Sequence, residues 1–518
     1  MRLILGILIF LIIISCQENQ RIENNEKQKS AEKETLKTQN KTLEDYKIPE
    51  FENKEYFGTK IPRTMSLLEN STKHISQNLK IQFYGQSIIG GLDQNLIINK
   101  LKEKYPTVKF NIIKNPIGGF TAPSLARVAV HDLYHEYADL IIFHVYGGDK
   151  SGDLESIFMN IKQKTTAEVI VFNHHLAYAG ENKEAQKKRT LSDFYGSKSI
   201  ELLANKYNFE FVDIRKPWED FISLNSELNI KSLLKDGVHP NKLGNELLAH
   251  CILQHFRYNP YLQSINSNIY NILFKSIENE QSLYKLNFKG DYILSNDLEL
   301  KKDSELSFEF NGNRVDIIPS FKNKDSQIEI FVNGLKPSEI SSLYYITRPT
   351  SNYKMWWPAL KRVSLSKLKE PIIQKYTLEI FNIHRGAKTF SFKISGDKTG
   401  FDGEGNNRED FLSNSKLISI KKKDFMIFKS ERVSKKETPE NFKVNFEIKS
   451  LATNRINISG NNQITLLKGV NNGINNITLK VKTGELKLDK IRIFKPEKTM
   501  PDAQSLPTLR YKKKNKMD

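Results

Sequence analysis

The chain has very little cysteine, glycine and proline for its length. Its 518 residues include 2 Cys, 26 Gly and 17 Pro. Two cysteines exclude a disulfide scaffold and zinc sites built from several thiolates. The glycine and proline content excludes collagen-like and low-complexity architectures. Aromatic residues make up 10% of the chain, which excludes a wholly disordered protein. At roughly 150 residues per domain, this length predicts three or four folded units.

Positive charge is in excess. There are 79 Lys and Arg against 60 Asp and Glu, a formal charge of +19. Such an excess is typical of nucleic-acid binders, but here the charges are spread along the chain and no binding module is recognisable, so we expect no nucleic-acid partner. The charge favours solubility and attraction to anionic polysaccharides or membrane surfaces, and no partner is assigned from it.

The first sixteen residues predict export. Met1-Arg2 precedes an apolar run over residues 3–14, which is too short to span a bilayer but suits a signal peptide. The following Ser15-Cys16 resembles the lipobox of bacterial lipoproteins, in which the cysteine carries the lipid. We therefore expect a signal peptide over 1–15, a lipid anchor at Cys16 and a location in the bacterial cell envelope. The alternative is an ordinary cleaved signal with a chance cysteine.

Composition then changes along the chain. Residues 16–75 are rich in Glu, Lys, Asn and Gln, which predicts a flexible tether. From residue 76 to 258, short apolar runs alternate with helix-like segments, which predicts a parallel sheet covered by helices on both faces. Sites in such sheets lie beyond the carboxyl ends of the strands. The expected strands are 79–84, 108–113, 138–143, 168–172 and 209–213.

Two loops of this region carry candidate chemistry. Gly85-Gln86-Ser87 follows the first expected strand, where a serine before a glycine-rich turn is a candidate nucleophile. Asp236-Gly-Val-His239 precedes the last expected helix. An aspartate there can orient the imidazole, which then accepts the serine proton. Each pattern alone is weak, but one sheet brings both loops to the same edge.

These two blocks resemble the first and last conserved blocks of the SGNH (GDSL-type) hydrolases, over residues 76–258. The resemblance implies a three-layer α/β/α, flavodoxin-like fold with Ser87 as nucleophile, His239 as general base and acid, and Asp236 as its partner. It also implies an oxyanion hole made by the backbone N–H of Ser87, a glycine after the second strand and an asparagine after the third. Gly118-Gly119 matches the glycine.

The chain departs from the family pattern at two positions. The third loop reads Tyr-Gly147-Gly148-Asp149, with Gly148 where the family has asparagine, and Gln86 replaces the usual aspartate. Backbone N–H groups of Gly147 or Gly148 can substitute for the missing donor, and Asn173 is another candidate. The side chains expected to contact substrate are those of Gln86, Asp149, Asn173, His174, Trp356 and Trp357.

The C-terminal half predicts recognition domains. Alternating apolar and polar residues over 285–400 and again over 411–497 are typical of antiparallel sandwiches. We expect two jelly-roll-like units, with one larger split unit as the alternative, a linker over 259–284 and a basic tail over 498–518. Trp356-Trp357 in the first unit either stacks on sugar rings or belongs to a core.

Together these features predict a lipid-anchored serine esterase that removes O-acetyl or other acyl groups from a carbohydrate or polysaccharide, with no cofactor and no metal. The alternatives are a glycan-binding lipoprotein that has lost its chemistry and a carbohydrate O-acyltransferase. The sequence leaves the sugar, the linkage and the oligomeric state open.

Overall fold

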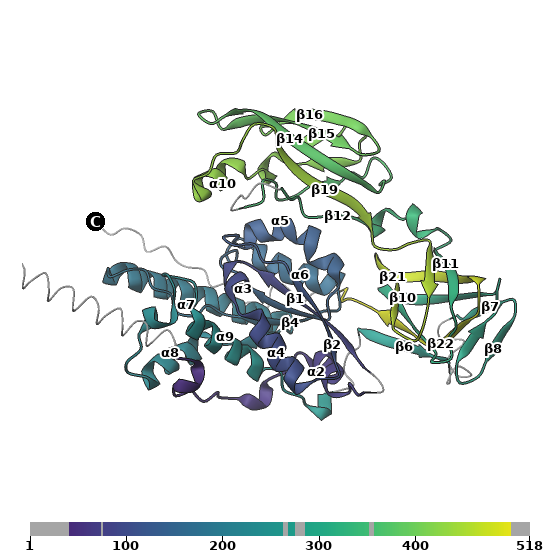
Figure 1. Cartoon of the computed structure of the whole chain (residues 1–518), viewed down its shortest axis with the longest axis horizontal. Helices are drawn as coiled ribbons and strands as arrows, with labels where there is room; N and C mark the ends of the chain where they lie inside the picture. The colour runs from purple at the N-terminus through teal and green to yellow at the C-terminus, as the bar shows by residue number, and fades with distance from the viewer. Residues whose placement is uncertain (1–40, 74–75, 263–267, 275–284, 352–356, 499–518) are drawn as a thin grey trace, which may run out of the picture.

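The α/β part of the molecule is built on a five-stranded parallel sheet (Figure 1). The computed structural model describes residues 41–73, 76–262, 268–274, 285–351 and 357–498. The strand order β2-β1-β3-β4-β5 is the flavodoxin-like order, and it confirms the predicted α/β class. The strands are β1 (Asn78–Gly85), β2 (Lys109–Lys114), β3 (Leu140–His144), β4 (Glu168–Phe172) and β5 (Glu210–Val212).

Helices cover both faces of this sheet. Ile81 and Phe83 of β1 belong to one core, which includes buried residues of α2, α4, α8 and α9. Ile141 and Phe143 of β3 belong to a second core, with buried residues of α5, α6 and α7. The result is three layers. The helices are α2 (Pro62–Glu69), α3 (Ser87–Gly91), α4 (Gln94–Lys104), α5 (Ala122–Asp132), α6 (Asp153–Lys164), α7 (Lys183–Lys206), α8 (Arg215–Leu224) and α9 (Lys242–Gln254), with 3₁₀ turns η1 (Leu43–Asp45), η2 (Lys54–Tyr56), η3 (Tyr134–Glu136), η4 (Ile230–Leu233) and η5 (Pro260–Leu262).

The segment before β1 is part of the α/β domain, so the predicted tether is too long. Ile61, Met65 and Leu68 are at most 1% exposed and pack into the first core. The backbone N–H groups of Gly58 and Lys60 donate to the two carboxylate oxygens of Glu210, each at 2.9 Å. Ile61, Met65 and Leu68 lie at i, i+4 and i+7, the spacing of one helical face, so the signal for this short helix was present in the sequence. Of the predicted tether, residues 16–40 and 74–75 lie outside the described part of the chain.

The C-terminal half forms two antiparallel units that are interleaved in sequence. The first is a nine-stranded sheet in which β10 pairs with both β21 and β22. Its apolar side chains form one core. The strands are β6 (Ile269–Leu273), β7 (Asn287–Lys289), β8 (Tyr292–Leu294), β9 (Leu298–Leu300), β10 (Glu305–Pro319), β11 (Ser326–Val332), β20 (Arg455–Ile458), β21 (Ile464–Thr483) and β22 (Leu486–Phe494).

The second unit is inserted between β11 and β20. A five-stranded sheet in the order β12-β19-β14-β15-β16 shares one core with a three-stranded sheet, β13-β18-β17. The elements are η7 (Pro337–Glu339), η8 (Ser341–Leu343), β12 (Tyr344–Ile346), β13 (Ser364–Leu365), β14 (Gln374–His384), β15 (Thr389–Gly396), β16 (Gly400–Asn406), β17 (Phe411–Leu412), β18 (Ile418–Ile420), η9 (Lys422–Asp424), α10 (Ile427–Ser434) and β19 (Phe442–Ser450).

This arrangement corrects the predicted boundaries. The chain does not divide near residue 400, because β20, β21 and β22 return to pair with the strands of 269–332. The expected linker contains β6, which pairs with β22 through Ile272 and Ile491. Alternation along a strand predicts that it lies in a sheet with one buried face, but it does not predict which other strand becomes its partner.

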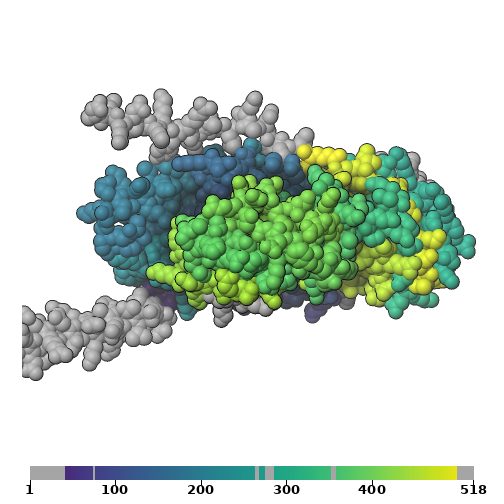
Figure 2. All heavy atoms as spheres, turned by 90° about the horizontal axis from the view of Figure 1, so that it is seen from above, coloured from purple at the N-terminus to yellow at the C-terminus, as the bar shows by residue number. Residues whose placement is uncertain are grey.

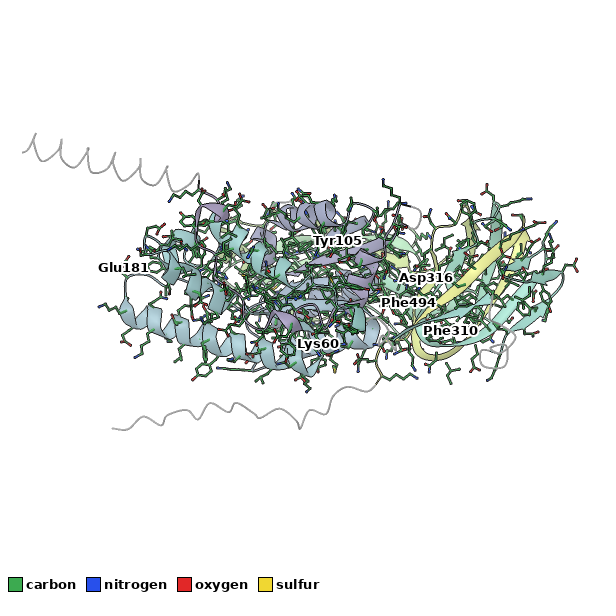
Figure 3. All side chains as sticks on the ribbon, turned by 90° about the horizontal axis from the view of Figure 1, so that it is seen from below. Lys60, Tyr105, Glu181, Phe310, Asp316 and Phe494 are labelled. Carbon is green, nitrogen blue, oxygen red and sulfur yellow. The ribbon has the colours of Figure 1, made fainter. Side chains whose placement is uncertain are left out.

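Both β units rest on the α/β domain. The second unit lies over α5 and beside the nine-stranded unit (Figures 1 and 2). His131 of α5 donates from Nδ1 to the carbonyl of Ile346 at 2.7 Å. Phe494 and Asp316 lie where the nine-stranded unit meets the α/β domain (Figure 3), and the Phe494 ring packs edge-on to Tyr137. Among the described residues, no helix combines the length and apolar character that crossing a membrane requires.

Candidate functional site

The serine loop is a tight turn between β1 and α3. Gly85 has φ +149°, and a Cβ there would lie 2.1 Å from the carbonyl oxygen of His144, so only glycine fits. Ser87 follows as the first residue of α3 and is half-buried. Ile88 and Ile89 are buried in the core beneath it. Because the first N–H groups of a helix have no intrahelical acceptor, the N–H of Ser87 is available to a ligand.

The aspartate and histidine of the second loop form a hydrogen-bonded pair. Nδ1 of His239 lies 2.8 Å from Oδ2 of Asp236, and the backbone N–H groups of Val238 and His239 both donate to Oδ1 at 2.8 Å. Partial burial opposes ionisation of the carboxylate, but these hydrogen bonds outweigh it and lower the pKa of Asp236 to about 2. A carboxylate held in the charged form fixes the proton on Nδ1 and leaves Nε2 as the base.

Neighbouring residues hold this loop in place. A Cβ at Gly237 would lie 2.5 Å from the carbonyl oxygen of Tyr178, and the N–H of Tyr178 donates to Gly237 at 2.8 Å. Nε2 of His175 donates to the carbonyl of Val238 at 2.7 Å. Burial lowers the pKa of His175 to about 4, so this imidazole is neutral. The sequence did not predict this role for His175; its position in the loop after β4 was the available signal.

The two loops share one end of the domain without a direct hydrogen bond. Ile88, next to Ser87, and Val238, next to His239, pack into the same core. Among the described residues, neither the hydroxyl of Ser87 nor Nε2 of His239 has a hydrogen-bond partner. Asp236 and His239 are therefore hydrogen-bonded to each other, and among the described residues no hydrogen bond joins Ser87 to His239. Catalytic hydrogen bonds often tighten only when substrate binds.

A glycine turn lies against the serine. The ideal Cβ position of Gly118 is 3.8 Å from the Cβ of Ser87. The N–H of Phe120 donates to Ile117 at 3.3 Å, and Gly119 between them has φ +74°, a turn conformation that favours glycine. The Gly118–Gly119 turn is therefore in contact with Ser87.

Trp357 of the second β unit fixes this turn. Its Nε1–H donates to the carbonyl of Gly118 at 2.8 Å, and its ring packs edge-on to Phe120. The side chain is buried at the junction of the two units and belongs to a core of the α/β domain. Of the two readings of the tryptophan pair, the core reading holds for Trp357.

The loop after β3 packs against the loop after β2. The N–H of Ala122 donates to the carbonyl of Tyr146 at 3.2 Å, and Gly147 faces Thr121. Gly148 has φ +83°, and a Cβ there would lie 2.4 Å from the Cβ of Ala122. This backbone therefore has no room for the asparagine of the family pattern. Gly147 and Gly148 contact the start of α5, whereas Gly118 contacts Ser87.

The other predicted contact residues are mostly buried. Asn173 donates from Nδ2 to Asp213 at 2.6 Å, and its oxygen accepts the N–H of Ile214 at 2.7 Å, so both ends serve the start of α8. Nδ1 of His174 pairs with Nε2 of His144 at 3.0 Å. The amide oxygen of Gln86 is buried without a partner among the described residues. Asp149 is half-buried at the third loop. Cys16 and Trp356 lie outside the described residues.

The candidate site is open to solvent. The side chains of His239 and Asp236 are 32% and 50% exposed. A cavity of about 910 Å³ lies on the other side of the Tyr178–Gly237 contact, between α7 and the carboxyl ends of β4 and β5. Ser87, Asp236 and His239 do not line it. Glu181, one of its lining residues, lies at the end of the molecule away from the nine-stranded unit (Figure 3). Within the described ranges, no three His, Cys, Asp or Glu side chains form a metal-binding group.

Comparison with known proteins gives weak similarities. No protein family model matches the chain, and no curated protein sequence matches it. Among solved structures, an acetylxylan esterase from Geobacillus stearothermophilus is 19% identical and covers 35% of this chain and 95% of its own, with a TM-score of 0.30. A two-domain esterase active on acetylated mannans, co-crystallised with mannopentaose, is 12% identical and covers 88% of this chain and 100% of its own, with a TM-score of 0.32. Similarity at this level supports no conclusion about fold or reaction.

Proposed function

We propose that this chain is a serine esterase that removes acyl groups from a carbohydrate polymer, with Ser87, His239 and Asp236 as its triad. The observation that carries the proposal is the Asp236–His239 pair, joined at 2.8 Å with the carboxylate held in its charged form. Ser87 starts a helix at the same end of the domain, beside a glycine turn that supplies backbone donors. Nucleophile, oriented base and oxyanion donors are the three elements of acyl transfer.

The reaction follows from these roles. The oxygen of Ser87 attacks the ester carbonyl while its proton passes to Nε2 of His239. The tetrahedral oxyanion accepts hydrogen bonds from the N–H of Ser87 and from the Gly118–Gly119 turn. Collapse of this intermediate releases the sugar hydroxyl, which takes the proton from His239, and leaves the acyl group on Ser87. Water, deprotonated by His239, then releases the acid.

The oxyanion hole in this proposal consists of backbone donors alone. One such donor contributes on the order of 3 kcal/mol to transition-state stabilisation. The family's third donor is an asparagine side chain, and Gly148 has none. We therefore expect a slower enzyme than one with all three donors, not an inactive one.

The exposure of the site favours a polymeric substrate. With His239 and Asp236 32% and 50% exposed, an ester on a polymer can reach Ser87 without its chain entering a closed pocket. A lipid at Cys16 and a spacer over residues 17–40 suit an enzyme that works on polysaccharide close to a membrane. The sugar and the acyl group remain open in this proposal.

The test is hydrolysis of 4-nitrophenyl acetate and of an O-acetylated polysaccharide by the purified protein. Ser87→Ala should lower kcat by roughly 10³-fold or more. The matched control is Ser76→Ala: Ser76 is exposed, precedes β1 at the opposite edge of the sheet and donates to the carbonyl of Thr107. Equal rates for wild type and Ser87→Ala would refute the proposal.

Among the described residues, no hydrogen bond joins Ser87 to His239. This favours one alternative, a glycan-binding protein without catalysis. In that case the wild-type chain binds the acetylated polysaccharide but releases no acetate. A third possibility, acyl transfer to a sugar, is separated by adding an unacetylated oligosaccharide, because hydrolysis leaves that acceptor unmodified.

A further inference from the structure

A second cavity, of about 520 Å³, lies between α5 and the second β unit. Its volume falls within the range of roughly 300–1,000 Å³ that is typical of small-molecule sites. Its walls come from both units: Arg127 lies on α5, Arg362 precedes β13, and Lys421, Lys422 and Lys423 surround the start of η9. The second β unit lies over α5 at this place (Figure 1).

Positive charge is in excess around this cavity. Arg127 is neutralised by the buried carboxylate of Asp424, with its Nε 2.8 Å from Oδ1. Lys421 pairs with Asp410 at 2.8 Å. After these two pairs, the three remaining cations that line the cavity are Arg362, Lys422 and Lys423, and none of them has a carboxylate partner among the described residues. The cavity therefore carries a net charge of +3, five cations less two carboxylates.

Arg362 is the most informative of these cations. Its guanidinium is half-buried, and its Nε donates to the hydroxyl of Ser364 at 3.1 Å. No hydrogen bond from its two terminal nitrogens to a described residue is present. A planar guanidinium presents these nitrogens as a fork that matches the two oxygens of a carboxylate or sulfate.

The electrostatics of Arg362 and of its neighbour Lys164 reflect the same excess of positive charge. Burial, aided by the charge of Arg362, lowers the pKa of Lys164. Burial and the charge of Arg127 also lower the pKa of Arg362, although Asp424 opposes this. Lys164 lies over the ring of Tyr134 at 4.7 Å and forms no ion pair with a described residue. Placing several partly buried cations together is costly unless an anion compensates them.

Contacts within the protein link the walls of the cavity to the candidate catalytic loop. Arg127 lies five residues beyond Ala122, at the start of α5, which is roughly 8 Å along the helix. On the other wall, η9 leads into α10, where Lys429 lies 4.8 Å from the ring of Trp357. Trp357 in turn bonds Gly118 beside Ser87. The two walls of the cavity therefore belong to elements that also hold the candidate catalytic loop.

We propose that this cavity binds an anionic group, a carboxylate or a sulfate, carried by the same polysaccharide chain whose ester reaches Ser87. The inference rests on the proposed esterase function for the identity of the chain, and it assigns a class of substrate: an acylated acidic polysaccharide. Arg362 supplies the bidentate contact, and Lys422 and Lys423 add charge at the cavity rim.

The test is a binding measurement that needs no turnover. Isothermal titration calorimetry of the full chain carrying Ser87→Ala uses three oligosaccharides of equal length: an oligogalacturonate, a sulfated carrageenan oligomer and a neutral galactan oligomer. We expect one acidic oligomer to bind and the neutral one to bind at least about tenfold more weakly. Which acidic oligomer binds distinguishes a carboxylate from a sulfate.

The residues are tested by removing charge at the cavity and elsewhere. Arg362→Gln and the pair Lys422→Gln/Lys423→Gln should each weaken binding of the acidic oligomer about tenfold. The matched control is Lys102→Gln/Lys109→Gln, two exposed lysines on α4 and β2, which should leave the Kd unchanged. Thermal unfolding confirms that each variant is folded.

The outcomes separate this inference from the proposed function. Equal binding of acidic and neutral oligomers, or an acidic oligomer whose Kd is insensitive to Arg362→Gln, would overturn the inference even if the wild type hydrolyses esters. Binding of anionic phosphatidylglycerol vesicles through Arg362, with no binding of either acidic oligomer, would overturn it as well. Absence of ester hydrolysis together with Arg362-dependent oligomer binding would leave the site standing and remove the esterase.

Discussion

Replacing Trp357 with phenylalanine tests whether the second β unit acts on the catalytic loop. The bond from Nε1 of Trp357 to the carbonyl of Gly118, at 2.8 Å, fixes the turn that lies beside Ser87. Trp357→Phe removes this bond and keeps an aromatic ring against Phe120. Loss of one such hydrogen bond costs about 1 kcal/mol, which corresponds to a rate reduced by about fivefold if the bond serves the oxyanion turn.

The assay is steady-state hydrolysis of 4-nitrophenyl acetate, together with inactivation by a fluorophosphonate that forms a tetrahedral adduct on the serine. We expect kcat to fall by about fivefold, KM to stay near the wild-type value and the inactivation rate to fall in parallel with kcat. A residue that only stabilises the fold would lower the unfolding temperature without this pattern.

Arg348→Gln is the control for the interface as a whole. Arg348 bonds Asp132 and donates to the carbonyl of Asn115 at 3.0 Å, so it joins the same two units without touching Gly118. Its replacement should leave kcat near that of the wild type. An unchanged kcat in Trp357→Phe, or an equal loss in Arg348→Gln, would refute the role assigned to the Trp357 bond.

Three further predictions concern stability. Gly148→Asn, which restores the residue of the family pattern, should lower the free energy of unfolding by more than about 1 kcal/mol and bring no gain in kcat, because its Cβ meets Ala122 and φ is +83°; a stable variant with a higher kcat in urea-unfolding and rate measurements would contradict this. Burial lowers the pKa of His131 and of His175 to about 4, so between about pH 6.5 and 4 the unfolded state binds protons that the folded state does not. The free energy of unfolding should therefore decrease as the pH is lowered through this range, by about 1.4 kcal/mol per pH unit for each histidine. Equal urea midpoints at pH 7 and pH 5 would exclude this. Deleting residues 41–69 should destabilise the α/β domain by several kcal/mol, because it exposes the core beneath buried Met65 and Leu68; a truncated protein that unfolds at the wild-type temperature in a thermal melt would show that the segment is a tether after all.

The parallel sheet was predictable because its strands β3 and β4 are nearly continuous apolar runs, buried on both faces. Ile141, Ile142 and Phe143 are all at most 1% exposed, and such runs are recognised without knowing their neighbours. The segment before β1 was not predictable in the same way. Ile61, Met65 and Leu68 have the spacing of one helical face, but the polar composition of the residues around them outweighed this short pattern in the sequence analysis.

The prediction of strand partners in the antiparallel half was wrong for a related reason. The register between β10 and β21, for example Phe308 opposite Ile477, joins segments about 170 residues apart in sequence. Local alternation reports which face of each strand is buried, and the two halves of the nine-stranded sheet have the same alternation. Their pairing therefore depends on long-range packing that one sequence does not display. The place of Trp357 also depends on long-range packing, because a tryptophan is compatible both with stacking on sugar rings at a surface and with burial in a core.

The departure from the family pattern at Gly148 and the bond made by Trp357 are two parts of one arrangement. Without an asparagine side chain, the proposed oxyanion donors are backbone N–H groups of Ser87 and of the Gly118–Gly119 turn. Glycine peptides rotate freely unless something holds them, and a trans peptide points its N–H opposite to its C=O. The indole that holds the carbonyl of Gly118 therefore sets the direction of the Gly119 N–H. In the proposed site, a side chain from the second β unit therefore orients the peptide that donates to the oxyanion, which would make that unit part of the site and not an appendage to it.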